Sequence, residues 1–469
     1  MRLKNGLSAG RRAERLALAG VALGAAYAAW DVARGARARR ANAGLLRGRH
    51  VVVLGAGFAG VHVAEELARL LPDADDADIT VVDEHGYLLF TPMLTEVAGG
   101  ELAPQHITAG THALAPRVKF VRARVTQVDL AARRVTLAAP GGDGAGGGTA
   151  GDAPAPPAEL VADHLVLALG SASNFHHTPG AAEHALTMKS LADATRVRDR
   201  VLAAARQAAG EQDHDRRGAL LTVVVGGGGY TGVETMAAVN DLLRDRVGRD
   251  APVRAVLVEA GDRILPELSA DLAAFAQREL ERRGVEVRVK TKVTRVDEGA
   301  VELAGGERIP AHTVVWAAGV AANAVLGDLP CQRDHDGRIV VDGTCAVPGH
   351  AGVWALGDCA AIPQPGSDRP YGPTAQNATR EGALVARNIV ATLRGRPTAS
   401  FTYRPIGELA LVGKRAGVAN VYGVHVSGLP AWALWRAVYL AKLPGTARRA
   451  RVALDWLGDL AAGPAARGA

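Results

Sequence analysis

The chain has 469 residues, a length that predicts about three domains at roughly 150 residues each. Hydrophobic residues make up 48% of it and charged residues 22%, which is typical of a globular protein with a sizeable core and excludes a disordered chain. Its three cysteines, Cys331, Cys345 and Cys359, form no CxxC pair. We therefore expect no disulfide framework, no metal site and a reducing compartment.

Charge is distributed unevenly along the chain. Residues 1–50 hold eleven Lys/Arg and two acids, residues 430–469 hold six and two, and the 379 residues between them hold 37 and 44. The body is thus mildly acidic, and its two basic ends are also apolar. Such ends suit an anionic lipid surface, where each Lys or Arg contributes on the order of 1 kcal/mol. Nucleic acid is not an expected partner, because the acidic body repels phosphate.

The N-terminal segment, residues 1–47, contains an uncharged run at residues 16–30 between two groups of arginines. As a helix this run spans about 22 Å, which is short of the roughly 30 Å hydrocarbon core of a membrane. Three alternatives stay open: a membrane-associated helix or short anchor, a helix packed on the body, and a flexible tail.

The first motif that carries chemistry follows an apolar strand at residues 51–54. It reads Gly55-Ala-Gly57-Phe58-Ala59-Gly60 and opens a helix, after which a second strand ends in Asp83. The three glycines allow a tight turn, the approach of a pyrophosphate and close packing of helix on strand, and the helix N-terminus faces the phosphates. A carboxylate at Asp83 can bind the ribose hydroxyls of an adenosine. The pattern predicts a dinucleotide site.

The same pattern recurs at residues 221–234. An apolar strand leads to Gly227-Gly-Gly229-Tyr230-Thr231-Gly232, and the next strand, residues 253–259, again ends in an acid, Glu259. Glu259 favours a free 2′-hydroxyl and repels a 2′-phosphate, so this second site is expected to prefer NADH to NADPH.

A third motif, Val353-Trp-Ala-Leu-Gly357-Asp358, places one carboxylate at the end of a short strand. Together the three motifs resemble the flavoproteins with two dinucleotide-binding domains. That resemblance implies an α/β fold in which the first site holds FAD and Asp358 binds its ribitol chain. Strands ending at Gly170 and Gly319 resemble the crossovers between the domains of that family. The resemblance implies an FAD domain of residues 48–185 and 315–395, with an NADH-binding domain inserted as residues 186–314.

Within this superfamily the chain is most similar to the type II NADH dehydrogenases. Disulfide reductases and sulfide:quinone oxidoreductases are disfavoured because no cysteine precedes residue 331. The segments at residues 81–102 and 228–234 match the family, and residues 372–382 resemble its AQxAxQxG quinone-site helix. Gln376 fits that pattern, whereas Arg380 stands where the pattern has its second glutamine. Arg380 is either a donor to quinone or an arginine paired with an acid on a solvated helix face.

Glu234 is the third candidate catalytic residue. The resemblance places it near the nicotinamide and the flavin. A second interpretation is that Glu234 lies in the first turn of its helix, where an anion is favoured by the helix dipole.

The C-terminal region, residues 396–469, contains two apolar stripes at helical spacing, separated by Pro444-Gly445. The first comprises Trp432, Trp435, Tyr439 and Leu443, and the second comprises Val452, Trp456 and Leu460, opposite Arg449, Arg451, Asp455 and Asp459. Tryptophan and tyrosine beside basic residues are typical of an interfacial membrane anchor. The alternative is a helical hairpin packed on the body or in a dimer interface.

The resemblance implies a peripheral enzyme on the cytoplasmic face of the cell membrane, with NADH, a membrane quinone, anionic lipid and a second copy of the chain as its partners. NADH reduces bound FAD by hydride transfer, and two electrons then pass to quinone without proton pumping. Two alternatives remain: a soluble or tethered flavin-dependent reductase of a ferredoxin-like protein, and a non-enzymatic NADH-binding flavoprotein.

Overall fold

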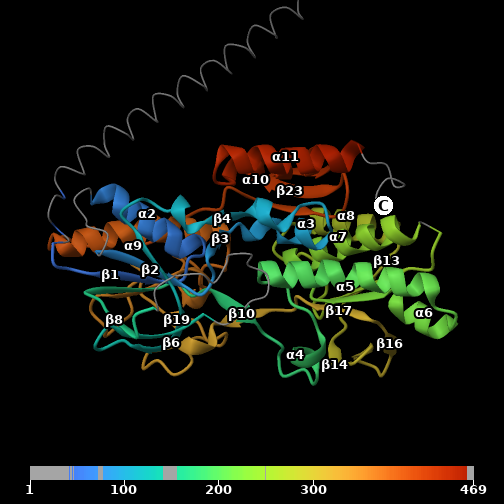
Figure 1. Ribbon diagram of the computed structural model, residues 1–469, viewed down its shortest axis with the longest axis horizontal. Coiled ribbons are helices and arrows are strands. Elements are labelled where there is room, and N and C mark those ends of the chain that lie inside the picture. The colour runs from blue at the N-terminus through green and yellow to red at the C-terminus, as the bar shows by residue number, and fades with distance from the viewer. Residues whose placement is uncertain are drawn as a thin grey trace, which may run out of the picture.

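The computed structural model describes residues 42, 45, 47–71, 78–140, 156–248 and 250–461. Two α/β lobes lie side by side, and a pair of helices lies across their top (Figure 1). The run at residues 16–30 is outside the described residues, so the three alternatives for it stay open. In the described part of the chain, no helix has both the length and the apolarity needed to cross a membrane.

The first lobe is built on a parallel sheet of five strands in the order β20-β9-β1-β2-β5. Its strands are β1 (Val51–Leu54), β2 (Ile79–Asp83), β5 (Lys119–Arg122), β9 (His164–Leu167) and β20 (Val353–Ala355). β1 is central and fully buried, as the unbroken run of Val and Leu requires of a strand covered on both faces. β20 comes from a late part of the chain. This sheet is therefore assembled from segments that precede and follow the second lobe in the sequence.

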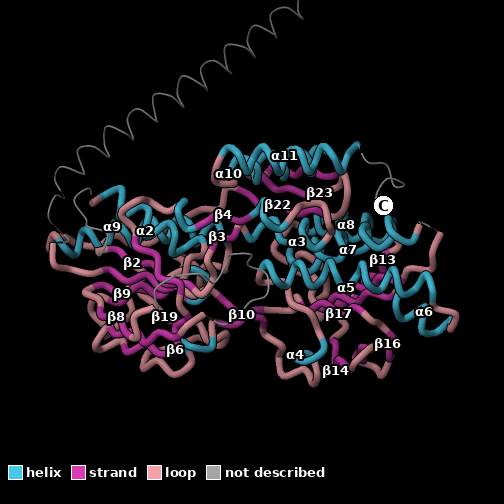
Figure 2. Tube along the Cα trace, viewed as in Figure 1, coloured by secondary structure: helices cyan, strands magenta, loops and turns pink. Residues whose placement is uncertain are grey.

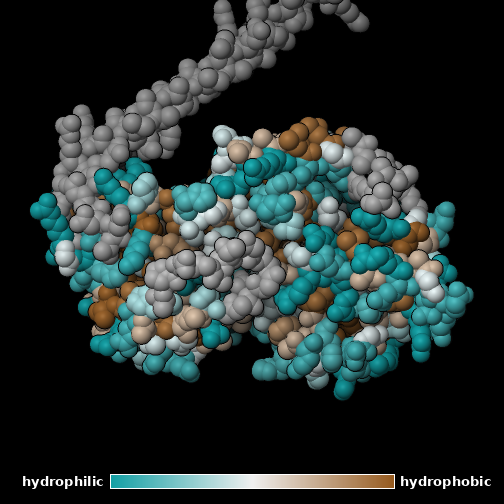
Figure 3. Space-filling view, viewed as in Figure 1, coloured by the Kyte–Doolittle hydropathy of each residue, from teal (hydrophilic) through white to brown (hydrophobic). Residues whose placement is uncertain are grey.

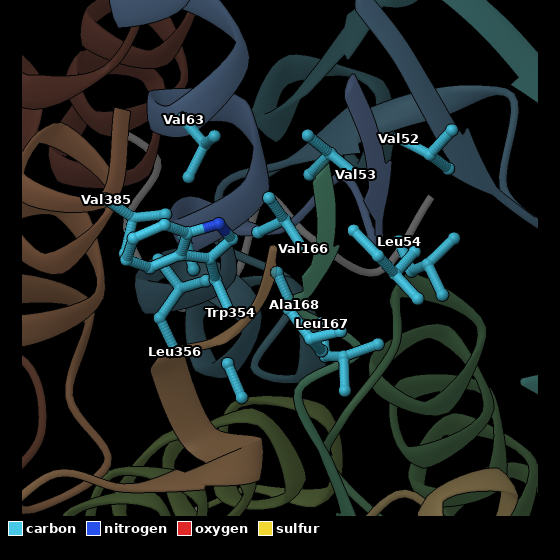
Figure 4. Close-up of a cluster of buried hydrophobic side chains, with 14 of the residues drawn as sticks. Val52, Val53, Leu54, Val63, Val166, Leu167, Ala168, Trp354, Leu356 and Val385 are labelled. Atoms are coloured by element: carbon cyan, nitrogen blue, oxygen red, sulfur yellow. The ribbon is translucent and has the colours of Figure 1, made fainter. Parts of the chain in front are cut away.

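Two helices of the first lobe, α2 (Phe58–Leu70) and α9 (Ala375–Leu393), pack against each other. Val63 of α2, Val385 of α9 and Trp354 of β20 surround one buried cluster (Figure 4). At the closest approach, a Cβ at Gly382 of α9 would lie 2.6 Å from the main-chain oxygen of Ala59 in α2. Only glycine allows this contact, which fixes the N-terminal part of α9 beside the first turn of α2.

The second lobe has a parallel sheet in the order β13-β12-β11-β17. Its main elements are β11 (Thr222–Gly226), β12 (Arg254–Val258), β13 (Val285–Arg288), β17 (Thr313–Trp316), α5 (Leu191–Gly210), α7 (Tyr230–Val247) and α8 (Ala270–Arg282). All four residues of β17 pair with β11. The expected boundary between residues 314 and 315 therefore cuts a strand, and the second sheet extends to Trp316.

A short helix connects the lobes. α3 (Leu94–Ala98) follows the first lobe's β2 in the chain, yet it packs on α5 and α7 of the second lobe. Three antiparallel strands then support the helical pair on top (Figure 2). These elements are β22 (Gly407–Leu411), β23 (Gly417–Val421), β24 (Val424–Gly428), α10 (Leu429–Lys442) and α11 (Thr446–Ala461).

The C-terminal aromatic stripes face the protein. Trp435 is 1% exposed and Trp456 6%, and both belong to the core that α3 and the second sheet share. The expectation that Asp455 and Asp459 lie opposite Trp456 is wrong, because Asp455 bonds His106 and Asp459 approaches Lys414. A helix that packs on its own protein has the same amphipathic pattern as a helix that lies on a lipid surface. The pattern therefore predicted the two helices but could not tell whether protein or lipid covers their apolar faces.

The outer face of α11 carries its own apolar patch, which we call the α11 patch. It consists of Leu454, 66% exposed, and Leu457, 60% exposed. Hydrophobic surface gathers over this helix in Figure 3.

Leu443→Ala at the end of α10 should lower the free energy of unfolding by about 2–5 kcal/mol, because the Leu443 side chain is fully buried in the shared core. The matched control is Leu454→Ala, the same change in the α11 patch, which should cost roughly 0.5 kcal/mol or less. Urea unfolding of both variants measures the two free energies. Equal losses would contradict the placement of Leu443 in the core.

Candidate active site

The first glycine turn has the geometry of a phosphate cradle. Gly55 has φ +102°, and a Cβ at Gly60 would lie 1.9 Å from the Gly55 oxygen, so both positions require glycine. A Cβ at Gly57 would meet nothing within 4 Å, and no side chain caps the helix that Gly57 opens. The first N–H groups of α2 therefore face open space, which is where a pyrophosphate binds.

Asp83 closes this turn at the carboxyl end of β2. Its carboxylate accepts hydrogen bonds from the Ala56 N–H (2.7 Å) and the His85 N–H (2.8 Å). Phe58, inside the turn, meets Phe90 edge to face at 5.6 Å. The residues at this turn fit the adenosine and pyrophosphate part of a dinucleotide.

The second glycine turn repeats the arrangement. Gly227 has φ +108°, a Cβ at Gly232 would lie 1.8 Å from the Gly227 oxygen, and the space at Gly229 is open. Glu259 accepts from the Gly228 N–H and the Gly261 N–H, both at 2.6 Å. The Glu259 carboxylate is thereby held at the edge of the turn, as recognition of a ribose requires. The neighbouring residue Thr231 lies in the first turn of α7.

The end of β20 brings Asp358 to the first lobe's cofactor side. Gly357 has φ +70°, and its Cβ would lie 3.1 Å from the Ala59 Cβ, so the chain passes close to the first glycine turn. Asp358 accepts from Ser171 Oγ at 2.8 Å, and Lys189 Nζ donates to the same hydroxyl at 2.9 Å. Asp358 therefore lies where a carboxylate can bind a hydroxylated chain that continues from the pyrophosphate.

The two crossover glycines have positive φ, +66° at Gly170 and +152° at Gly319. Strands β10 (Ser171–Ser173) and β18 (Val320–Ala322) start directly after them and pair antiparallel. The two crossings between the lobes therefore run side by side, next to Asp358.

Glu234 does not lie in the first turn of α7, because the helix begins at Tyr230 and has no acid in that turn. Its carboxylate is buried and accepts a hydrogen bond from the Leu411 N–H at 2.9 Å. Burial raises the pKa of Glu234 to about 8, against the lowering effect of the Leu411 and Trp435 hydrogen bonds. The interpretation as a helix-dipole partner in the first turn is therefore wrong: Glu234 is a buried carboxyl group whose pKa is raised by its burial.

Gln376 and Arg380 share one face of α9, as their spacing predicts. Gln376 donates to the Gly407 oxygen at 2.8 Å and accepts from Tyr403 Oη at 2.9 Å. The Arg380 guanidinium lies over the Tyr403 ring, 4.0 Å from its centroid, and donates to the Gln376 main-chain oxygen. Arg380 makes no ion pair with an acid anywhere in the described ranges, so it is not the acid-paired surface arginine of the second interpretation.

Beside this group is an open hollow of about 450 Å³, lined by Arg404, Pro405, Ile406, Gly407, Glu408, Asn420, Tyr422 and Gly423. Its volume is in the range that binds small organic molecules, roughly 300–1,000 Å³.

The cysteines lie outside the nucleotide turns. Cys345 and Cys359 are buried and Cys331 is partly buried, and all three are free thiols. Burial raises the pKa of Cys359 to about 12, so its thiol is protonated at neutral pH. Cys359 thus packs near Asp358 and supplies no thiolate.

Sequence reasoning missed three polar residues that bond the predicted ones: Ser171, Lys189 and Tyr403. It also missed a buried group beside Glu234, in which Arg436 pairs with Glu96 and Glu101. Glu96 and Glu101 fall within the family-like segment at residues 81–102, which was the one available signal. The others come from segments far apart in the chain, and no local pattern relates them.

Comparisons with known proteins identify the family of the chain. Residues 49–382 match the family pyridine nucleotide-disulphide oxidoreductase, and residues 406–463 match the NDH2 C-terminal domain. The chain is 30% identical to a type II NADH:quinone oxidoreductase of Mycobacterium tuberculosis, over 87% of this chain and 88% of that one. It is 29% identical to a type II NADH:quinone oxidoreductase of Staphylococcus saprophyticus, over 81% and 91%.

A solved structure has a similar fold. NDH2 from Plasmodium falciparum, in complex with NADH, aligns with a TM-score of 0.78 at 18% identity, over 89% of this chain and 99% of that one.

The raised pKa of Glu234 predicts a pH-dependent stability. Between the ordinary value of 4.5 and about 8, the folded chain holds a proton that the unfolded chain has lost. The free energy of unfolding should therefore fall as the pH rises, by about 1.4 kcal/mol per pH unit for this one group. Glu234→Gln should remove that part of the slope. The free energy of unfolding of the variant, relative to that of the wild type, should therefore increase from pH 5 to pH 8.

Urea unfolding at several pH values measures this slope. The control is Glu281→Gln, an exposed glutamate of α8, whose curve should run parallel to that of the wild type. A parallel curve for Glu234→Gln would show that Glu234 is ionised throughout.

Proposed function

The chain belongs to the pyridine nucleotide-disulphide oxidoreductase family and, within it, to the type II NADH:quinone oxidoreductases, and we propose that it works as a non-pumping enzyme on the cytoplasmic face of the cell membrane. The substrates are NADH and quinone, and the bound cofactor is FAD. The observation that carries this proposal is the contact of α9 with the first glycine turn. Gly382 brings the helix of Gln376 and Arg380 against Ala59, beside the cofactor cradle.

Each part of the two nucleotides would be bound by a separate group of residues. The turn at Gly55, Gly57 and Gly60 with Asp83 would hold the adenosine and pyrophosphate of FAD, and Asp358 its ribitol. The turn at Gly227, Gly229 and Gly232 with Glu259 would hold NADH. When bound, FAD supplies the two-electron chemistry between NADH and quinone.

Gln376 and Arg380 would orient the quinone. The Gln376 amide is already held by Gly407 and Tyr403, so its position is fixed before quinone arrives. Arg380 carries a positive charge with no acid partner among the described residues, and such a charge stabilises the negative charge that develops on a quinone oxygen. The hollow next to Gly407 is the access that we propose for the quinone.

Membrane association would use the α11 patch. Of the tryptophans that suggested an anchor, Trp435 and Trp456 are core residues and Trp432 is partly buried against the same core. They therefore give no argument against the soluble ferredoxin reductase. The argument for lipid contact rests instead on Leu454 and Leu457 together with exposed basic residues of the same helix, Arg449 and Arg451.

A turnover assay with NADH and a short-chain quinone on the purified yellow protein tests the function. Rapid quinone reduction is expected. Turnover with a ferredoxin and not with quinone would favour the reductase, and slow bleaching with no acceptor would favour the non-enzymatic alternative.

Coenzyme preference should depend on Glu259. The wild type should prefer NADH to NADPH more than about tenfold, because a carboxylate repels the 2′-phosphate. Glu259→Gln should narrow the ratio of the two kcat/KM values, whereas Glu281→Gln should leave it unchanged. Equal use of both coenzymes by the wild type would contradict the assignment of Glu259.

Arg380 should affect only the quinone half of the reaction. Arg380→Gln recreates the family pattern and should keep quinone turnover with an altered KM. Arg380→Glu should slow reoxidation by quinone on the order of 100-fold, because it places an anion where negative charge develops. Bleaching by NADH without an acceptor should stay unchanged in both. The control is Arg387→Glu, an exposed arginine further along α9. Equal quinone rates in all variants would exclude Arg380 from the quinone site.

The α11 patch should decide lipid binding. Leu454→Glu with Leu457→Glu should weaken co-sedimentation with anionic vesicles by about tenfold or more per leucine, since each leucine contributes roughly 1.5–3 kcal/mol when buried in lipid. Val161→Glu, an exposed valine of β8 (Glu159–Val161), is the control. A change in oligomeric state without a change in lipid binding would assign the patch to a dimer contact.

A further inference from the structure

One tyrosine contacts both residues of α9 that we place in the quinone site. Tyr403 lies in the segment between α9 and β22, a few residues before Gly407, and its side chain is partly buried. The hydroxyl and the ring of Tyr403 make separate contacts. Each of these contacts fixes a different group of the site.

The Tyr403 hydroxyl connects Gln376 to the rim of the 450 Å³ hollow. Tyr403 Oη accepts a hydrogen bond from the main-chain N–H of Ile406 at 3.2 Å, and it donates to Gln376 Oε1 at 2.9 Å. Since the Ile406 N–H brings its own proton, the single proton of the hydroxyl is free for Gln376. Ile406 lines the hollow, so the hydroxyl fixes the Gln376 amide relative to that rim.

The orientation of the Gln376 amide follows from its two partners. Gln376 Nε2 donates to the main-chain oxygen of Gly407 at 2.8 Å. A carbonyl oxygen can only accept, so the amide nitrogen must face Gly407 and the amide oxygen must face Tyr403. Nε2 carries two N–H groups, and within the described ranges only Gly407 accepts from it. The second N–H is therefore left for a ligand, and Gln376 is exposed enough for a ligand to reach it.

The Tyr403 ring holds the positive charge beside this amide. The Arg380 guanidinium lies 4.0 Å from the ring centroid, and its Nη1 donates to the Gln376 main-chain oxygen at 2.9 Å. A guanidinium is attracted to the face of an aromatic ring. Tyr403 thus fixes one neutral donor through its hydroxyl and one charged donor through its ring.

Tyr403 is itself held by the core of the first lobe. Tyr371 Oη accepts from the Tyr403 main-chain N–H at 3.1 Å. The Phe401 ring meets Tyr371 edge to face at 4.8 Å and lies 6.5 Å from the Tyr403 ring. Tyr371 and Phe401 are buried members of that core. The position of Tyr403 is therefore determined before any ligand arrives.

The two redox forms of the substrate differ in their hydrogen bonds. The carbonyl oxygen of a quinone only accepts, whereas the hydroxyl of a quinol has a proton to donate. The second N–H of Gln376 and the guanidinium of Arg380 only donate, so both suit a quinone. The Gln376 oxygen, which could accept from a quinol, is bonded to Tyr403.

We propose that Tyr403 makes this site select quinone over quinol, because it holds the Gln376 amide so that it offers the ligand an N–H and not an oxygen. The inference rests on the proposed function. Tyr403 acts through Gln376 and Arg380, so it is a positioning residue. Weaker binding of quinol would also help the product to leave.

Anaerobic equilibrium dialysis of a short-chain quinone and of its quinol against the FAD-loaded protein, without NADH, tests the selection. The wild type should bind the quinone more tightly than the quinol. Tyr403→Phe removes the hydroxyl and keeps the ring, so the Gln376 amide can turn while Arg380 stays in place. This variant should bind quinone about tenfold more weakly and quinol within about twofold of the wild type. Equal losses for the two ligands would indicate a general distortion of the site and would overturn the proposal.

Reoxidation kinetics give an independent test of the route through Gln376. Tyr403→Phe should raise the KM for quinone about tenfold, with kcat within about twofold and unchanged bleaching by NADH. In a Gln376→Leu background, adding Tyr403→Phe should change that KM by less than about twofold, because the hydroxyl acts through the amide. A further tenfold change in the double variant would overturn the proposal.

The matched control is Tyr371→Phe, which removes a hydroxyl from the same aromatic group that bonds the Tyr403 main chain and not Gln376. It should leave the ratio of quinone to quinol affinity unchanged. An equal shift of that ratio in both variants would overturn the assignment to the Tyr403 hydroxyl. Wild-type protein that binds quinone and quinol equally would overturn the selection alone. Wild-type protein that NADH bleaches, but that binds no quinone and is reoxidised by none, would instead overturn the proposed function.

Discussion

Both nucleotide sites depend on one steric constraint, the contact of a helix with the turn that precedes it. At Gly60 and at Gly232, the helix lies so close to the preceding glycine's oxygen that no Cβ fits. This contact leaves the uncapped helix N-terminus facing open space and brings the following strand's carboxylate, Asp83 or Glu259, to the edge of the turn. Gly382 extends the same constraint to α9, since it packs the helix of Gln376 and Arg380 on α2. The positions of the two glycine turns and of α9 thus follow from glycines that cannot be replaced.

The sequence predicted the features that depend on such local sterics. The two glycine turns, their acids and the helix at Ala375 lie where the pattern placed them, because glycine spacing and strand hydrophobicity act over a few residues. The environment of Glu234 could not be predicted, since its hydrogen-bond partners, Leu411 and Trp435, come from far along the chain. Tyr403, which holds Gln376, was missed for the same reason.

The C-terminal helices show a second limit of the pattern. Periodicity identifies the apolar face of a helix and not the surface that covers it. Here Trp435 and Trp456 are in the core, and the guanidinium of Arg436 is buried between aromatic rings. Burying that charge is costly, and the hydrogen bond to Glu101 offsets part of the cost. The C-terminal region is therefore part of the folded body. The outward-facing residues of α11, such as Leu454 and Leu457, remain available to contact another surface.

The position of α3 restricts how the enzyme can move. α3 belongs in the chain to the first lobe, packs on α5 and α7 of the second, and is held from above by Arg436 through Glu96 and Glu101. Many two-lobed enzymes admit and enclose substrates by rotating one lobe about a hinge. In this chain α3 shares one core with the second sheet, α10 and α11, so a rotation of the lobes would carry α3 and its buried ion pair with the second lobe. The chain would then have to bend between β2 and α3, and the hinge of any such rotation belongs in that connection rather than within the core.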